Sequence, residues 1–203
     1  MEIVCLDMEG VFVPEIWINV AEKTGIKELR LTTRDISDYD VLMKKRLGIL
    51  EENGLKIGDI QAVIAAMSPL DGAVAFLDWL RSRTRPIIVS DTFTQFSGPL
   101  IEKLGWPTLF CNTLSIDPDG TITGYNLRQV DGKRETVLAL KRLNYSIIAV
   151  GDSYNDITML KEADTGILFR PPDSVIAEYP EFPVTSTYEE LKGHIQNKLA
   201  GNI

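Results

Sequence analysis

The stretch IVCLDMEGV, residues 3–11, decides the fold that this chain can form. Its first four residues are all apolar, which is typical of a short strand buried on both faces of a sheet. Asp7, Met8, Glu9 and Gly10 then end the strand with two acids and a turn residue. Because ligands of open α/β sheets bind beyond the carboxyl ends of the strands, this polar break also marks a candidate site.

Outward from this stretch, apolar strands alternate with amphipathic helices. Strands are predicted at 3–6, 86–89, 108–110, 114–116, 121–127, 146–150 and 166–169. Helices are predicted at 14–25, 38–52, 57–67, 72–83, 96–104, 134–143, 155–162 and 187–199. The alternation predicts an α/β protein with a doubly wound, mainly parallel sheet, interrupted by a hairpin around residues 117–120.

A block of helices at 14–70 separates the first strand from the next convincing one. In a doubly wound fold a single helix normally makes this connection, so the block is an insertion. We interpret it as a small helical cap inserted after strand one. Residues 1–13 and 71–203 then form the catalytic core.

The composition, with 44% hydrophobic and 25% charged residues, indicates an ordinary globular protein. Its formal net charge of -8 argues against nucleic acid or an anionic membrane as partner, because both attract a basic face. Cys5 and Cys111 stand in apolar surroundings and are expected to be buried, reduced thiols. With no signal peptide and no apolar run of about 20 residues, a cytoplasmic location is predicted. The sequence leaves the oligomeric state open.

Polar residues follow three of the predicted buried strands. They are Asp7 and Glu9, then Ser90, Asp91 and Thr92, and finally Asp152, Ser153, Asn155 and Asp156. Each acid alone could be a helix N-cap after a strand. Together they would crowd carboxylates at one edge of the sheet, where a cation must offset their repulsion. Mg²⁺ fits such a site, since it prefers oxygen ligands and keeps several waters.

Lys133 stands at the start of a predicted helix, from which its ammonium could reach the same edge. A lysine in the first turn opposes the helix dipole, which favours a functional reason for its position. The alternative is an ordinary solvated lysine.

With these residues in place, the chain resembles the haloacid-dehalogenase superfamily of phosphoryl-transfer enzymes. The segments that match its four motifs in order are Asp7-Met8-Glu9-Gly10-Val11, Ser90, Lys133 and Gly151-Asp152-Ser153-Tyr154-Asn155-Asp156. The small cap after the first motif is similar to that of phosphoserine phosphatases. The resemblance runs from residue 1 to about residue 169 and implies a Rossmann-like core with a Mg²⁺ cofactor.

Two features are similar to one subgroup, described as phosphoserine phosphatase with phosphoserine:homoserine phosphotransferase activity. Its members have Glu two residues after the nucleophile and a Ser-Asp-Thr second motif, which stand here as Glu9 and Ser90-Asp91-Thr92. The resemblance implies that O-phospho-L-serine is dephosphorylated in amino-acid biosynthesis. It also implies homoserine as a phosphoryl acceptor beside water.

The resemblance further implies which residues catalyse the reaction. Asp7 is implied as the nucleophile that becomes an aspartyl-phosphate, and Glu9 as general acid and then base. Ser90 and Lys133 are implied to hold the phosphoryl oxygens. Asp91 and Asn155 are implied to contact the substrate.

The implied metal site uses residues of the first and fourth motifs. Asp7, the backbone carbonyl of Glu9 and Asp152 are implied as Mg²⁺ ligands. Asp156 is implied to hold metal-bound water.

Within the predicted cap, Glu15 and Arg46 resemble the pair that binds the ammonium and carboxylate of a phosphoamino acid. The planar guanidinium of arginine suits a carboxylate, because it can donate to both oxygens. From the residues alone, Arg46 could equally lie on a solvated helix face beside Lys44 and Lys45. Glu15 could be a first-turn acid that interacts with the helix dipole.

Two other functions remain open at this point. One is a phosphatase of the same superfamily for another small phosphate ester, which the core motifs do not exclude. The other is a receiver-type phosphoacceptor module, which also uses aspartate, lysine and Mg²⁺ on a doubly wound sheet. The helical block at 14–70 argues against a receiver.

Overall fold

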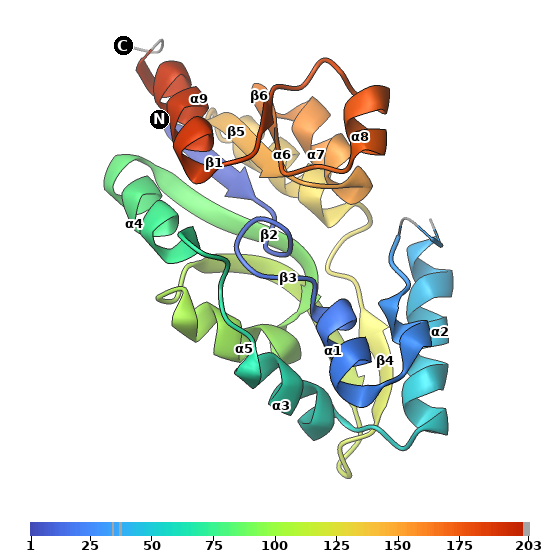
Figure 1. Cartoon of the computed structure of the whole chain (residues 1–203). Coiled ribbons are helices and arrows are strands. Elements are labelled where there is room, and N and C mark those ends of the chain that lie inside the picture. Colours follow the sequence, from blue (N-terminus) through green and yellow to red (C-terminus); the bar gives the residue numbers. More distant parts are fainter. Residues whose placement is uncertain (34, 37, 201–203) are drawn as a thin grey trace.

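The computed structural model describes residues 1–33, 35–36 and 38–200 of the 203-residue chain. Seven strands form one sheet in the order β4-β3-β2-β1-β5-β6-β7 (Figure 1). They are β1 Glu2–Leu6, β2 Arg85–Phe93, β3 Thr108–Ile116, β4 Ile122–Asn126, β5 Ser146–Gly151, β6 Thr165–Phe169 and β7 Val184–Thr185. All neighbouring pairs are parallel except β3 with β4. The predicted doubly wound, mainly parallel sheet is confirmed.

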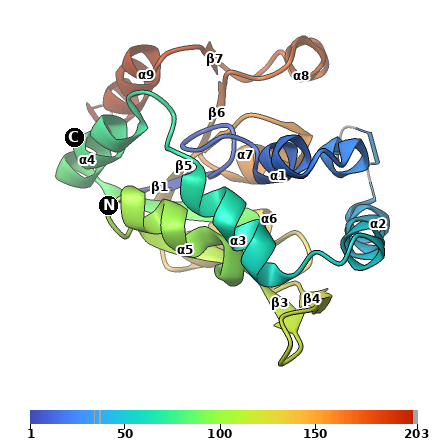
Figure 2. The same cartoon turned by 60° about the horizontal axis from the view of Figure 1, so that its bottom comes forward.

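Two layers of helices cover the sheet, one on each face (Figures 1 and 2). One layer consists of α4 Ala73–Arg83, α5 Thr94–Lys103 and α9 Tyr188–Ala200. The other consists of α6 Gly132–Arg142, α7 Ile157–Glu162 and α8 Asp173–Glu178. Strand side chains alternate between these layers: Val4 and Leu6 of β1 face the first, and Ile3 and Cys5 face the second.

The segment between β1 and α4 forms the helices of the predicted cap. They are α1 Ile16–Thr24, the 3-10 helix η1 Lys27–Arg30, α2 Tyr39–Glu52 and α3 Ile57–Ala66. In Figure 1 α2 lies beside β4, and both views place α3 beside α5. Val20 of α1 and Ile64 of α3 belong to the same apolar cluster as Phe76 of α4. The cap therefore shares its apolar packing with the first helix layer, and its boundaries at residues 14 and 70 stay a prediction.

Several predicted boundaries were wrong in informative ways. The second strand does not end before Ser90 but continues through Asp91 and Thr92 to Phe93, while its regular pairing with β3 stops at Val89 and resumes at Phe93. The predicted strands 108–110 and 114–116 are one strand, β3. The polar residues Asn112 and Thr113 hid this continuity. The short elements η1, α8 and β7 had no periodic signal and were not predicted.

Both cysteines are buried free thiols, as predicted. Burial raises the pKa of Cys5 to about 12 and that of Cys111 to about 11, so neither thiol is activated. Within the described part of the chain, no helix is both long enough and apolar enough to cross a bilayer.

Candidate active site

The site forms where the strand order reverses, at the carboxyl ends of β1 and β5. The Asp7 N–H donates to the Val150 carbonyl at 3.0 Å, which places the residue after β1 against the end of β5. The connections that follow β1 and β5 lead to opposite sides of the sheet, so the helices that follow the two strands separate and leave a crevice between them. The resulting crevice brings Asp7 close to Asp152 and Asp156, whose nearest carboxylate oxygens all lie within 4.8 Å of one another.

Two glycines allow this close approach of carboxylates. A Cβ at Gly10 would lie 2.5 Å from Cγ of Asp152, and the φ of Gly10 is +76°. A Cβ at Gly151 would lie 2.3 Å from Cβ of Asp156. Distances this short are far inside van der Waals contact, so each position requires glycine. Because these two positions have no side chain, the carboxylates of Asp152 and Asp156 can pack directly against the backbone that follows β1 and ends β5.

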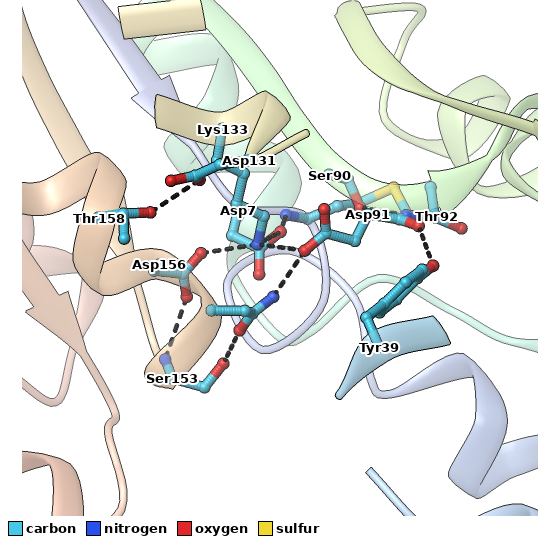
Figure 3. A network of polar contacts seen from close by, with 12 residues as sticks. Asp7, Tyr39, Ser90, Asp91, Thr92, Asp131, Lys133, Ser153, Asp156 and Thr158 are labelled. Carbon is cyan, nitrogen blue, oxygen red and sulfur yellow. Dashed lines mark hydrogen bonds and ion pairs between the residues drawn. The ribbon is translucent and has the colours of Figure 1, made fainter. Parts of the chain in front are cut away.

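Lys133 is the cation at the centre of the site (Figure 3). Its ammonium lies 2.7 Å from Asp156, 3.1 Å from Asp7 and 3.6 Å from Asp91, and the side chain is only 2% exposed. Burial alone would lower the pKa of Lys133, but these three carboxylates outweigh it and hold the pKa well above its usual value. The predicted functional lysine is therefore at the site, and the solvated alternative is wrong.

Asp156 organises the backbone of the site as well as its charge. One carboxylate oxygen accepts from Lys133, and the other accepts from the N–H groups of Asp152 and Ser153 at 2.9 and 3.1 Å. The side chain is fully buried. With both oxygens engaged, Asp156 is better suited to hold metal-bound water and the Asp152 loop than to bind a metal directly.

Asp91 lies opposite these acids, at the irregular part of β2. Its Oδ2 accepts from the Asn155 amide at 2.9 Å, and its backbone carbonyl accepts from the Tyr39 hydroxyl at 3.1 Å. Figure 3 shows Tyr39 reaching Asp91 from the cap side. Ser90, the adjacent residue, is 5% exposed. The interrupted pairing of β2 is therefore where the strand presents these polar side chains to the site.

Glu9 extends from the loop after β1 toward the cap. Its carboxylate accepts from the Ile16 N–H, at the first residue of α1, at 2.7 Å. Burial, and next to it the charge of Glu15, raises the pKa of Glu9 to about 8, against the opposing effects of the Ile16 N–H and Arg46. A carboxylic acid that keeps its proton near neutral pH is suited to donate it to a leaving oxygen.

Arg46 projects from α2 into the site and is only 7% exposed, so the alternative of a solvated helix face is wrong. One η nitrogen donates to the Leu31 carbonyl at 2.8 Å, and the guanidinium stacks over Trp17 at 4.6 Å. Its Nε has no hydrogen-bond partner in the described part of the chain. Burial lowers the pKa of Arg46 to about 10. A buried guanidinium with an unused donor suits an anionic ligand.

A pocket of about 80 Å³ collects most of the predicted residues. It is lined by Asp7, Glu9, Glu15, Arg46, Ser90, Asp91, Lys133 and Asn155, while Asp152 and Asp156 stand beside Asp7. Tyr39 and Trp17 also line it and were not predicted. Their positions in the sequence gave no signal, because an aromatic residue on a helix is usually part of the core.

The residues present fit a divalent cation. Burial raises the pKa of Asp7, Lys133 lowers it, and Asp156, Asp152 and Asp91 raise it again, with a net pKa well above the usual value. One ammonium does not offset this many acids, so a second positive charge is needed to keep Asp7 ionised. Mg²⁺ is the expected ion, since the side-chain donors here are carboxylate oxygens.

The fold and this site define a class of protein. A family model described as haloacid dehalogenase-like hydrolase matches residues 1–164, and the chain belongs to that family. Over 192 residues it is 62% identical to the phosphoserine phosphatase ThrH of Pseudomonas aeruginosa, which covers 95% of this chain and 94% of that one. A phosphoserine phosphatase of Pseudomonas syringae is also 62% identical, over 95% of this chain and 81% of its own.

Solved structures agree on the fold. A phospho-aspartyl intermediate analogue of a phosphoserine phosphatase superposes with a TM-score of 0.77 at 23% identity, and covers 95% of this chain and 97% of that chain. An apo phosphoserine phosphatase gives a TM-score of 0.74 at 24% identity, with 91% and 93% covered. The resemblance inferred from the four motifs is confirmed, and a receiver-type module is not supported.

Gly151→Ala should weaken Mg²⁺ binding by at least about tenfold, as expected for disturbing an outer-sphere partner. The added Cβ would displace Asp156 and break its bonds to the Asp152 and Ser153 N–H groups. Calorimetric Mg²⁺ titration measures the effect. Gly193→Ala, with nothing within 4 Å, is the matched control and should leave the affinity unchanged. A Gly151→Ala protein that binds Mg²⁺ like the wild type would contradict this account of the site.

Proposed function

We propose that this protein is a Mg²⁺-dependent phosphatase that hydrolyses O-phospho-L-serine through an aspartyl-phosphate on Asp7. The family assignment supports phosphoryl transfer, and two relatives at 62% identity are named phosphoserine phosphatases. The observation that supports the substrate best is the buried, incompletely bonded guanidinium of Arg46 in the same pocket as Asp7 and Glu15. A phosphoamino acid has a phosphate, a carboxylate and an ammonium for these three residues.

Asp7 and Glu9 would share the chemistry of the first step. The Asp7 carboxylate attacks phosphorus, the bond to the serine oxygen breaks, and the Glu9 proton passes to that oxygen. In the second step Glu9 takes a proton from water, whose oxygen attacks the acyl-phosphate and releases Asp7. The hydrogen bond from the Ile16 N–H holds the Glu9 carboxylate on the cap side of Asp7.

Ser90 and Lys133 would hold the phosphoryl oxygens during both steps. Both side chains are buried, at 5% and 2% exposure, where a fixed donor acts more strongly than in water. Asp7, the Glu9 carbonyl and Asp152 would hold Mg²⁺, with Asp156 binding its water. When bound, Mg²⁺ supplies positive charge that neutralises the phosphoryl oxygens.

Glu15 and Arg46 would select the substrate from the cap side. Arg46 suits the carboxylate because burial has removed it from water while leaving Nε unused. Glu15, the residue before α1, suits the ammonium. We propose residues 14–70 as the substrate-reading cap and the rest as the catalytic core. The cytoplasmic location stays a prediction.

Asp7→Asn should lower phosphoserine turnover by roughly 10⁴-fold or more, because an amide cannot attack phosphorus. Release of inorganic phosphate from phosphoserine measures the loss, with circular dichroism to verify the fold. Asp173→Asn, an exposed acid in α8, is the control and should keep full turnover. If Asp7→Asn keeps a tenth of the wild-type rate, another residue is the nucleophile.

Arg46→Ala should lower kcat/KM for phosphoserine by about 2–4 kcal/mol of transition-state binding, as expected for losing a buried charged hydrogen bond. With p-nitrophenyl phosphate, which has no carboxylate, the loss should be much smaller. Steady-state assays on both substrates give the comparison. Lys45→Ala, on an exposed position of α2, should change neither rate constant. Equal losses on both substrates would show that Arg46 serves the fold or the phosphate instead.

We further propose that homoserine competes with water for the aspartyl-phosphate. Glu9 has one methylene more than Asp, and this length lets its carboxylate reach the start of α1. A base held there is closer to a hydroxyl presented by the cap than to a water against phosphorus. Glu9→Asp should therefore shift the product ratio from O-phosphohomoserine toward free phosphate. Quantifying both products at saturating homoserine tests this, and an unchanged ratio would show that Glu9 does not select the acceptor.

A further inference from the structure

A second cavity, of about 430 Å³, shares a wall with the catalytic pocket. The two have Thr33, Tyr39, Ser90, Asp91, Lys133 and Asn155 in common. The remaining lining of the larger cavity comes from β3, α6 and the segment 127–131, together with Val89, Tyr154 and Thr158. Its volume is within the range of cavities that bind small molecules. The catalytic steps proposed above use none of the residues that this cavity adds.

Asp91 and Arg128 contribute opposite charges to this cavity. Asp91 uses Oδ2 for its contacts with Asn155 and Lys133, while Oδ1 accepts no hydrogen bond from the described residues. Arg128 donates from Nε to the Cys111 carbonyl at 3.1 Å, and its guanidinium forms no ion pair within the described ranges. One carboxylate oxygen and one guanidinium edge are therefore available to a ligand.

Asn112 fixes the spacing between the backbones of these two residues. Its side chain is only 7% exposed. It donates to the Asp91 carbonyl at 3.3 Å and accepts from the Arg128 N–H at 3.0 Å. A buried amide that bonds to both backbones fixes the two backbone positions relative to each other. From this fixed backbone the two side chains extend to the surface, where the Asp91 side chain is 39% exposed and Arg128 is exposed.

The rest of the lining suits a short aliphatic chain with a hydroxyl. Leu127 and Val130 line the cavity although they are 44% and 83% exposed, so a ligand would cover apolar surface that now faces water. Thr136 and Tyr154 add hydroxyl groups. A simple anion would meet the Asp91 carboxylate, and a simple cation would meet Arg128. A zwitterion satisfies both.

We propose that this cavity is a second binding site for a free hydroxy-amino acid, with its carboxylate on Arg128 and its ammonium on Asp91. The inference rests on the proposed function, since serine is then the released alcohol and homoserine the competing acceptor. The amino acid's ammonium would bind Asp91, the residue after Ser90, so the ligand would lie beside the pocket in which the phosphoryl group is transferred. It is separate from the Glu15 and Arg46 pair in the cap.

Titration of the Mg²⁺-loaded protein with L-serine, followed by ¹H–¹⁵N NMR, distinguishes the two sites. Amide signals of Gly132 and Gln129 report the second cavity, and those of Trp17 and Leu42 report the catalytic pocket. We expect both sets to shift. In Arg128→Gln the Kd reported by Gln129 should rise at least tenfold, while Trp17 keeps its Kd. Arg142→Gln, an exposed arginine at the other end of α6, should change neither.

Two probes of the wild-type protein test the inference without a substitution. Ethanolamine, which is serine without its carboxylate, should shift the Gln129 signal with a Kd at least tenfold higher than that of L-serine. Inorganic phosphate should shift Gly132, the neighbour of Lys133, but leave the Gln129 signal in place. A Gln129 signal that ignores L-serine, that follows phosphate equally well, or that keeps its Kd in Arg128→Gln would overturn the inference. Failure of the proposed function would appear separately, as absence of phosphoserine turnover in the wild type.

Discussion

The Lys133 ammonium lies within 3.6 Å of three carboxylates that belong to three different strand ends. Asp7 follows β1, Asp91 lies in β2 and Asp156 follows β5. The single Lys133 ammonium therefore links the three central strands β2, β1 and β5. Removing one partner of a buried charged pair typically costs about 3–5 kcal/mol, because the other charge is left unpaired. The carboxylates still outnumber the ammonium. Burial raises the pKa of Asp7 and the surrounding carboxylates raise it further, so a further cation fits at the same place.

At the cap the uncompensated buried charge is positive instead of negative. There the buried charge is the guanidinium of Arg46, and the residues around it supply one carbonyl, one sulfur atom and an aromatic face but no ion-paired carboxylate within the described chain. The pocket is thus acidic on the sheet side, where a metal fits, and basic on the α2 side, where a ligand carboxylate fits. A net charge of -8 for the whole chain makes such local positive charge a selective device for anionic groups.

The sequence was sufficient to predict the fold class and to predict that most of the candidate site residues lie together at one edge of the sheet. Parallel strands place their carboxyl ends together, so acids after three apolar runs had to meet. The sequence was insufficient to predict contacts that depend on a side-chain conformation or on an irregularity within a strand. Nothing in the order of residues showed that β2 continues through Ser90, or that Tyr39 reaches the Asp91 carbonyl. Gly10 and Gly151 stand in the sequence, but only the structure shows why they must be glycine: an added Cβ would lie 2.5 Å from Cγ of Asp152 and 2.3 Å from Cβ of Asp156, respectively.

Contacts at both ends of α2 hold this helix on the catalytic half of the fold. At its beginning, Tyr39 donates to the Asp91 carbonyl at 3.1 Å and packs edge-on against Tyr125 of β4 at 5.9 Å. Beyond its end, Lys56 pairs with Asp119 at 2.9 Å, at the tip of the β3–β4 hairpin. Arg46 lies between these two anchors. The hairpin and the irregular part of β2 therefore position Arg46, which is proposed to bind the substrate carboxylate, relative to the residues proposed to transfer the phosphoryl group.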